Sequence, residues 1–333
     1  MKNLFPWLLI VLIVISGCTT DGQTNSPTLI LPSPESTQAL LANPTSVQPT
    51  PVPDSPLPTA TATERPTPTI TPSPTPFICS FMLGRTESET FFSNLMGEQV
   101  AYLVHLPPCY DQFPTYAFPT LYLFHGWPLN EYHWVNLGVD VYADDYVSRG
   151  ITGPYIIVMP GVGSEGLFVN SSGGSYSFEG MVVDELVPHI DGKYRTWRLP
   201  AARAVGGISR GGVWALEIAL RHQDLFSIVG GHSPALALNR PLPQYDPYRL
   251  VIEGAGDLRF YLDAGDNDWA RAAAINFRDF LEDREVPVTY DLHQGGHVDA
   301  LWRSGLSDYL LFYAETWPRS YEDLPLWTLP PVE

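Results

Sequence analysis

Basic residues and cysteines are scarce in this sequence of 333 residues. Lys and Arg number 18 against 36 Asp and Glu, so the formal net charge is −18. A chain of this charge, without a clustered run of basic residues, is not expected to bind nucleic acid or an anionic membrane surface. Only three cysteines are present, and we find no internal repeat. The composition therefore argues against nucleic-acid-binding and repeat proteins.

The chain begins with an apolar run that is too short to span a bilayer. Leu4–Ile15 follows Lys2, whereas a membrane-spanning helix needs about 20 residues. The segment Ile15-Ser16-Gly17-Cys18 resembles the lipobox of bacterial lipoprotein signal peptides. This resemblance implies that residues 1–17 are a signal peptide and that Cys18 is lipidated and anchors the chain to the cell membrane. An ordinary secretory signal with a chance cysteine is the alternative. Both predict an extracytoplasmic protein.

A segment rich in Pro, Thr and Ser follows, from residue 18 to residue 76. Such a segment cannot bury enough apolar surface to offset its ordering entropy, so we predict an extended, disordered stalk. Residues 77–333 are long enough for one large domain with a sizeable core.

Cys79 and Cys109 flank the first predicted strands, and an oxidising compartment would allow them to form a disulfide. Two free buried thiols are the alternative.

Strand-like apolar runs alternate with amphipathic helical runs through residues 77–333. The strand-like runs are Gln99–Leu106, Pro119–His125, Pro154–Pro160, Arg203–Ile208, Ser227–Gly231, Arg259–Asp263 and Pro287–His293. The helical runs are Val139–Arg149, Phe178–Ile190, Arg210–Arg221, Asp268–Arg284 and Val298–Ala314. This order predicts an α/β fold with a mostly parallel sheet covered by helices on both faces. Around Thr90–Phe92 and Gln99–Leu106, we expect an antiparallel hairpin.

The motif Gly207-Ile208-Ser209-Arg210-Gly211 lies between a predicted strand and a predicted helix. A G-x-S-x-G sequence alone is weak, but a strand-to-helix turn is the context in which a nucleophilic serine becomes exposed. The turn is strained, and glycines without a Cβ let it close. Ser209 is therefore the predicted nucleophile.

A serine nucleophile needs a base to take its proton and a carboxylate to orient that base. Downstream of Ser209, one strand ends near Asp263, Asp266 and Asp268, and the next ends at Gln294-Gly295-Gly296-His297. This is the order Ser, Asp, His of α/β-hydrolases. We predict His297 as the base and Asp268 as the acid, with Asp266 and Asp263 as alternatives. The histidines expected to be structural are His222, His232 and His293.

Acyl transfer also needs hydrogen-bond donors for the oxyanion and a wall for the substrate. The backbone N–H groups of Arg210, just after the serine, and of Trp127, in the turn after the strand Leu121–Phe124, are the predicted oxyanion donors. The main predicted aromatic wall consists of Tyr132, Trp134 and Trp302. Further aromatic candidates are His133, Phe168 and Trp269; core or rim packing is the alternative for each tryptophan.

Several segments in order resemble one known family. They are Val104–Asp111, Leu121–Gly126, Gly207–Gly212, Arg221–Phe226, Gly265–Asp268, and Gly295–His297 with Trp302. From about Gly84 to Trp317, the chain resembles the putative esterase family of α/β-hydrolases. That family includes feruloyl and acetyl-xylan esterases, S-formylglutathione hydrolase, enterochelin esterases and mycolyltransferases. The resemblance supports the triad Ser209, Asp268 and His297. The departures are Cys109 in place of a glycine, Gln223 in place of the proline after His222, and the bulky Trp127 in the oxyanion turn.

Together these features predict an extracytoplasmic serine carboxylesterase that hydrolyses an ester of a carbohydrate or a small acyl compound. The predicted reaction passes through an acyl-enzyme and needs no metal or organic cofactor. Acyl transfer to an envelope sugar or lipid is an alternative, since it uses the same triad with a different second nucleophile. A wall- or sugar-binding lipoprotein without activity is the alternative from another class. The sequence leaves the oligomeric state open.

Overall fold

The computed structural model describes Cys79 and residues 82–162 and 173–328. The predicted signal peptide, Cys18, the stalk and Phe168 lie outside the described residues. In the described part of the chain, no helix combines the length and apolar character needed to cross a membrane.

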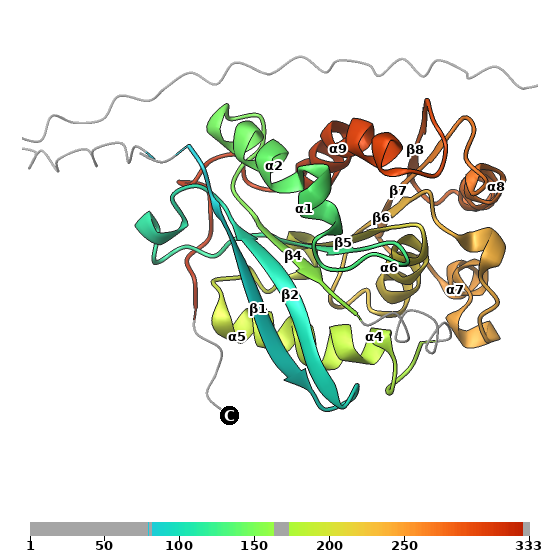
Figure 1. The fold of residues 1–333 in the computed structure, drawn as a ribbon, viewed down its shortest axis with the longest axis horizontal. Coiled ribbons are helices and arrows are strands. Elements are labelled where there is room, and N and C mark those ends of the chain that lie inside the picture. The colour runs from blue at the N-terminus through green and yellow to red at the C-terminus, as the bar shows by residue number, and fades with distance from the viewer. Residues whose placement is uncertain (1–78, 80–81, 163–172, 329–333) are drawn as a thin grey trace, which may run out of the picture. The chain divides into compact units, whose positions relative to one another are not determined.

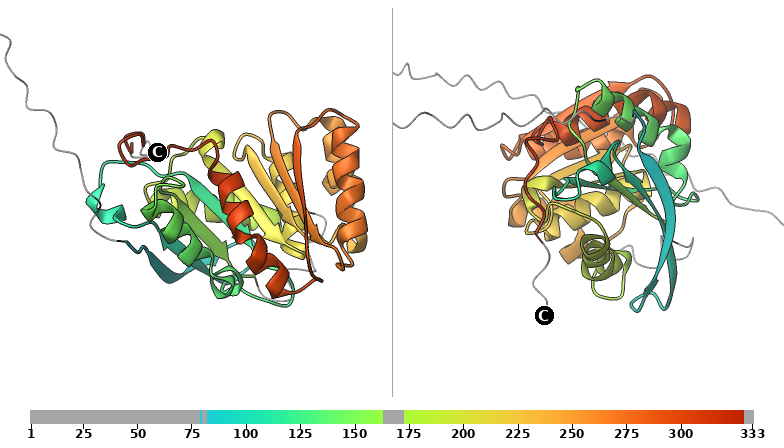
Figure 2. Two further views of the ribbon diagram at one scale, coloured as in Figure 1. Left: turned by 90° about the horizontal axis from the view of Figure 1, so that it is seen from above. Right: turned by 90° about the vertical axis from the view of Figure 1, so that its left-hand side faces the viewer.

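Eight strands form one sheet in the order β1-β2-β4-β3-β5-β6-β7-β8. Strands β3 to β8 run parallel to one another, whereas β1 and β2 form an antiparallel hairpin and β2 pairs antiparallel with β4. Figure 2 shows this long hairpin at one edge of the sheet. The bounds of the strands are β1 Arg85–Ser93, β2 Glu98–Leu106, β3 Thr120–Phe124, β4 Ile156–Pro160, β5 Arg203–Ile208, β6 Ile228–His232, β7 Arg259–Gly265 and β8 Val288–His293.

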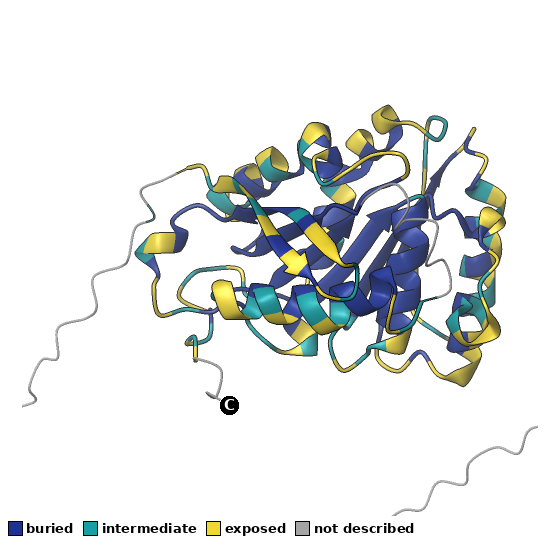
Figure 3. Ribbon diagram, turned by 60° about the horizontal axis from the view of Figure 1, so that its bottom comes forward, coloured by how far each residue is buried: buried dark blue, intermediate teal, exposed yellow. Residues whose placement is uncertain are grey.

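Helices cover both faces of the sheet, as Figure 1 shows. The α-helices are α1 His133–Leu137, α2 Val139–Ser148, α4 Phe178–Gly180, α5 Val187–Lys193, α6 Arg210–Arg221, α7 Pro247–Glu253, α8 Arg271–Glu282 and α9 Asp299–Ala314. Helices α1, α2 and α9 pack on one face, and α4 to α8 pack on the other. The central strands are buried on both sides (Figure 3), which explains why they read as continuous apolar runs.

Alternate strand residues contribute to two separate cores. Tyr122 and Phe124 of β3 pack with α4 and α6, whereas Leu121 and Leu123 of the same strand pack with α1 and α9. This alternation follows from the two-residue side-chain period of a strand. The predicted α/β fold with a mostly parallel sheet is confirmed.

Three details differ from the sequence predictions. Strand β1 begins at Arg85, five residues before the expected Thr90, because its polar half gives little apolar signal and is fixed by pairing with β2. The helix expected over Phe178–Ile190 contains a π-helical segment, η2 Met181–Leu186, between α4 and α5. Helix α8 begins at Arg271 and not at Asp268, so Asp268 lies in the loop before it.

A disulfide joins Cys79 to Cys109, with the two Cα atoms 5.7 Å apart. It connects the segment before the hairpin to the residue that precedes the short 3₁₀ helix Tyr110–Gln112. Cys109 itself has φ of 58°, a left-handed conformation in which glycine is the least strained residue. The disulfide thus joins Cys79, before the hairpin, to the segment that follows β2.

Candidate active site

Three loops at the carboxyl edge of the parallel strands bring Ser209, Asp268 and His297 together. Ser209 follows β5, Asp268 follows β7 and His297 follows β8. The Nε2 atom of His297 lies 2.8 Å from the hydroxyl oxygen of Ser209. Its Nδ1 atom lies 2.9 Å from Oδ1 of Asp268. A serine, an imidazole and a carboxylate in this order form a hydrogen-bond chain that can draw the serine proton toward the imidazole.

The serine occupies a strained turn between β5 and α6. Its φ of 55° and ψ of −111° are unusual for a residue with a Cβ atom. Glycine is required beside it, because a Cβ on Gly207 would lie 2.3 Å from the carbonyl carbon of Gly211. A Cβ on Gly211 would lie 2.6 Å from the carbonyl oxygen of Phe124. The turn therefore closes only with the small residues that the motif supplies.

Asp268 is held as an ionised hydrogen-bond acceptor. Its side chain is fully buried, and its Oδ1 atom also accepts a hydrogen bond of 2.8 Å from the backbone N–H of Ala270. Burial raises the pKa of this carboxyl, but hydrogen bonds from His297, Ser233 and the Ala270 amide outweigh burial and lower the pKa overall. A carboxylate on Nδ1 favours the tautomer of His297 whose Nε2 atom accepts a proton from Ser209.

The two competing aspartates have other partners. Asp263 is buried, and its Oδ2 atom lies 2.9 Å from Nδ1 of His232. Oδ1 of Asp266 accepts a hydrogen bond of 2.9 Å from the backbone N–H of Gly295 and so joins the loop of Asp268 to the loop of His297. Within the described residues, Asp268 is the one of the three that contacts His297.

The predicted oxyanion turn packs directly against the serine turn. A Cβ on Gly126 would lie 3.5 Å from the Cβ atom of Ser209. Trp127 follows Gly126, is joined to Pro128 by a cis peptide bond, and lines one cavity together with Ser209 and Arg210. Arg210 is the first residue of α6, and the first N–H groups of a helix point outward along its axis. Both predicted donor residues thus border the serine.

His133, which the sequence offered only as an aromatic wall, supports this turn. The backbone N–H of Gly126 donates a 3.3 Å hydrogen bond to its Nδ1 atom, and its Nε2 atom lies 3.3 Å from Oδ1 of Asp299. Burial lowers the pKa of His133 to about 4, although Asp299 opposes the shift. The ring is therefore neutral at pH 7, with Nδ1 as the acceptor and Nε2 as the donor.

Two cavities adjoin Ser209 and His297. The first, of about 530 Å³, is lined by Trp127, Ser209, Arg210, Ala235, Leu238, Arg240, Trp269 and His297. The second, of about 440 Å³, is lined by Gly126, Trp127, Pro128, Leu129, His133, Ser209, His297, Val298, Asp299 and Trp302. An ester whose carbonyl lies at the serine therefore has two neighbouring spaces for its groups.

The aromatic wall was predicted only in part. Trp134 is wrong as a wall residue: it is 1% exposed, and its Nε1 atom donates to the carbonyl of Phe124 within the core. Trp302 is 5% exposed, but its ring lies edge-on to His297 at 5.0 Å and borders the second cavity. Tyr132 is exposed, with its hydroxyl 3.4 Å from that of Ser88, and lines neither cavity among the described contacts. Trp127 and Trp269 supply the exposed rings.

A buried network lies behind the serine and was not predicted from the sequence. His232 is fully buried between Asp263 and Tyr313, whose hydroxyl lies 2.9 Å from its Nε2 atom. Two glycines paired across β5 and β6, Gly206 and Gly230, leave space for this hydroxyl, because a Cβ on either would lie within 2 Å of it. Since the carbonyl of His232 accepts a 2.8 Å hydrogen bond from the N–H of Ser209, the network fixes the serine backbone.

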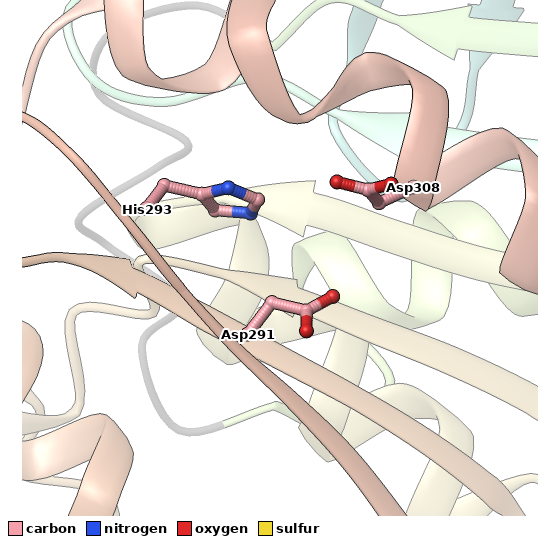
Figure 4. Close-up of side chains that lie close together, drawn as sticks. All are labelled: Asp291, His293 and Asp308. Carbon is pink, nitrogen blue, oxygen red and sulfur yellow. The ribbon is translucent and has the colours of Figure 1, made fainter.

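One other cluster in the described part of the chain combines groups that could bind a cation. Asp291, His293 and Asp308 offer ligand atoms within 4.8 Å of one another, from β8 and α9 (Figure 4). The hydroxyl of Tyr261 donates a 2.6 Å hydrogen bond to Asp291. This cluster is separate from the hydrogen-bonded residues Ser209, His297 and Asp268 and shares no residue with them.

The comparisons with known proteins agree with this geometry. Residues 93–313 match the family described as "Putative esterase". The chain is 30% identical over 181 residues to an endo-1,4-beta-xylanase/feruloyl esterase of Xylanibacter ruminicola, covering 52% of this chain and 25% of that protein. The chain thus spans about a quarter of the length of that relative.

Solved structures show the same fold. A ferulic acid esterase aligns with a TM-score of 0.64 and 25% identity, covering 71% of this chain and 100% of that one. An S-formylglutathione hydrolase from Staphylococcus aureus aligns with a TM-score of 0.60 and 18% identity, covering 69% and 99%. The predicted resemblance is confirmed: this chain belongs to the putative esterase family and has the α/β-hydrolase fold.

Proposed function

We propose that this protein is a serine carboxylesterase that hydrolyses esters of carbohydrates or of small acyl compounds. The observation that carries the proposal is the hydrogen-bond chain from Ser209 through His297 to Asp268, open to two cavities. Membership of the esterase family supports the same reaction class. The relatives named as feruloyl esterases support an ester of a carbohydrate and a phenolic acid as one candidate substrate.

In the proposed reaction, Ser209 attacks the ester carbonyl while His297 takes its proton. The backbone N–H groups of Arg210 and Trp127 stabilise the tetrahedral oxyanion, and Asp268 stabilises the imidazolium. His297 then gives its proton to the departing alcohol, which leaves Ser209 acylated. Water, activated by His297, attacks the acyl-enzyme and frees the acid. The proposed residues complete this cycle without a metal or an organic cofactor.

Exposed aromatic rings near the serine suit a sugar or a phenolic group. Trp127 is 53% exposed and Trp269 is 47% exposed, and both line the first cavity. Rings in such positions offer apolar faces to a planar or carbohydrate ligand. Trp269 also lies 4.3 Å from the His297 ring, so a ligand on its face would be close to the base.

Acyl transfer to an envelope sugar or lipid is the second candidate. It is favoured by the second cavity, which also borders both Ser209 and His297 and could hold an acceptor hydroxyl in place of water.

We further propose the extracytoplasmic location, with residues 1–17 as the signal peptide and Cys18 as the lipid anchor. Labelling of the full chain with a radioactive fatty acid, lost in Cys18→Ser, tests the anchor.

Hydrolysis of short-chain p-nitrophenyl esters and of feruloylated sugars by the full chain in mild detergent tests the main proposal. We expect turnover that Ser209→Ala abolishes and that the exposed helix-surface change Ser304→Ala leaves unaltered. Absence of turnover in folded wild type, from acetyl to feruloyl esters, would contradict the hydrolase. An acceptor-dependent shift of product from free acid to transferred ester would favour the transferase.

A further inference from the structure

Among the described residues, the lining of the larger cavity beside Ser209 is cationic, unlike the chain as a whole. The chain has 36 acidic residues for 18 basic ones. The cavity, however, is lined by two arginines, Arg210 and Arg240, and no Asp or Glu lines it among the described residues. Arg240 forms no ion pair with any described residue, and such a cation in the cavity of the serine, in a protein with net charge −18, indicates a ligand that is itself negatively charged.

Arg240 has one edge of its guanidinium held and the other edge available. Its Nη1 atom donates to the carbonyl oxygens of Ala237, at 2.9 Å, and Asn239, at 2.5 Å. The side chain is exposed, and it forms no ion pair with any described residue. Its Nε and Nη2 groups make no hydrogen bond in the described part of the chain. A guanidinium fixed in this way presents two parallel donors, the geometry that matches a carboxylate.

Arg210 has a different role in the same wall. Its Nη1 atom donates a 3.0 Å hydrogen bond to Oδ1 of Asn239, and its guanidinium lies 5.6 Å from the ring of Trp214. Arg210 is 9% exposed, whereas Arg240 is exposed. Arg210 therefore anchors Asn239, and the backbone of Asn239 in turn holds Arg240 at the cavity.

We infer that the substrate carries a carboxylate on the part of the ester that fills this cavity, and that Arg240 binds it. This inference rests on the proposed esterase function. The cavity of about 530 Å³ has room for an acyl or alcohol group between the serine and this residue. A carboxylate paired with an arginine at a partly exposed site contributes about 1 kcal/mol, a factor of about five. Arg240 is thus assigned as a specificity-determining residue.

Two matched pairs of esters test this inference with the full chain in mild detergent. In the acyl arm, p-nitrophenyl 4-carboxybenzoate is compared with p-nitrophenyl 4-methylbenzoate. In the alcohol arm, 4-carboxyphenyl acetate is compared with 4-methylphenyl acetate. The rigid rings keep each carboxylate away from the reacting carbonyl. The readout is the ratio of kcat/KM for the anionic ester to that for the neutral ester, in wild type, Arg240→Gln and Arg240→Lys.

We expect Arg240→Gln to lower this ratio about three- to tenfold in one arm, which identifies the side of the ester that occupies the cavity. Arg240→Lys should retain part of the wild-type ratio, because lysine keeps the positive charge but cannot donate two parallel hydrogen bonds to one carboxylate. Higher ionic strength should lower the wild-type ratio in the same arm. The control Arg249→Gln removes the same charge from the exposed surface of α7 and should leave the ratio unchanged.

An equal ratio in wild type and Arg240→Gln in both arms would overturn the inference while leaving the esterase function in place. An equal fall in Arg249→Gln would also overturn it, because the effect would then come from net charge and not from the cavity. If folded wild type hydrolyses p-nitrophenyl acetate but none of the four esters, the inference is overturned and the esterase function stands. If it hydrolyses neither these four nor any ester from acetyl to feruloyl, the proposed function is rejected, and the inference with it.

Discussion

Glu217 allows the electrostatics of the buried helix α6 to be tested by one substitution. Its side chain is fully buried, and both carboxyl oxygens lack a hydrogen-bond partner in the described structure. Burial raises its pKa from the ordinary 4.5 to about 9; Glu179 adds to the shift, and Arg221 and Arg210 oppose it. Glu217 is therefore protonated in the folded protein at pH 7.

The sign of the pH dependence follows from this shift. Between pH 4.5 and pH 9, the unfolded chain releases the Glu217 proton while the folded chain keeps it. The contribution of Glu217 to the free energy of unfolding is thus fully favourable below pH 4.5. Above pH 4.5 this free energy falls by about 1.4 kcal/mol for each unit of pH. From pH 5 to pH 8, the loss is on the order of 4 kcal/mol.

Urea unfolding of wild type and Glu217→Gln at pH 5 and pH 8 measures this loss. The amide has a cost of burial that does not change with pH, and the other carboxylates titrate equally in both proteins. We expect the free energy of unfolding of Glu217→Gln, relative to wild type, to rise by on the order of 4 kcal/mol between the two pH values. The control Glu282→Gln, on the exposed end of α8, should show a change below about 0.5 kcal/mol. The same relative stability at both pH values would refute a buried, protonated Glu217.

Three further variants address the candidate active site and the structure around it. Asp268→Asn should lower kcat about 10²- to 10⁴-fold on p-nitrophenyl acetate while circular dichroism stays native, because the base loses its orienting carboxylate; a change below fivefold would contradict that role. Cys79→Ser with Cys109→Ser opens a loop of 30 residues and should lower the free energy of unfolding by about 3 kcal/mol. Activity at 25 °C should remain, and unchanged urea unfolding would refute this account. Gly207→Ala should abolish activity and lower the melting temperature, since its Cβ would meet the backbone of α6 at 2.3 Å; full activity would show that the turn can widen.

Periodicity and glycine placement were sufficient to predict most of the fold. The strands β3 to β7 are apolar on both faces, and the sequence showed them as continuous runs between helical patterns. The polar half of β1 gave no such signal, because its order depends on pairing with β2, as between Arg85 and Leu106. Helix α1, five residues long, was too short for a periodic pattern.

Site residues on strand exits were the easiest to propose, and residues that act through packing were the hardest. Ser209 lies two residues from Gly207 and from Gly211, and His297 directly follows Gly296; these glycines mark sharp turns. Trp134 gave no sign that α1 directs it into the core, where it donates to a carbonyl. Arg240 lies in an irregular loop after β6, without any motif, and only the folded chain brings it to the serine cavity.

Labelling with a fluorophosphonate probe tests the central claim most directly, because such a probe reacts covalently with a serine that a neighbouring base has activated. Intact-mass measurement and peptide mapping of the full chain should show one adduct, located on Ser209. The adduct should be absent in Ser209→Ala and strongly slowed in His297→Ala, and it should persist in Ser304→Ala. An unlabelled folded wild type, or an adduct that remains in Ser209→Ala, would contradict the assignment of Ser209 as the nucleophile.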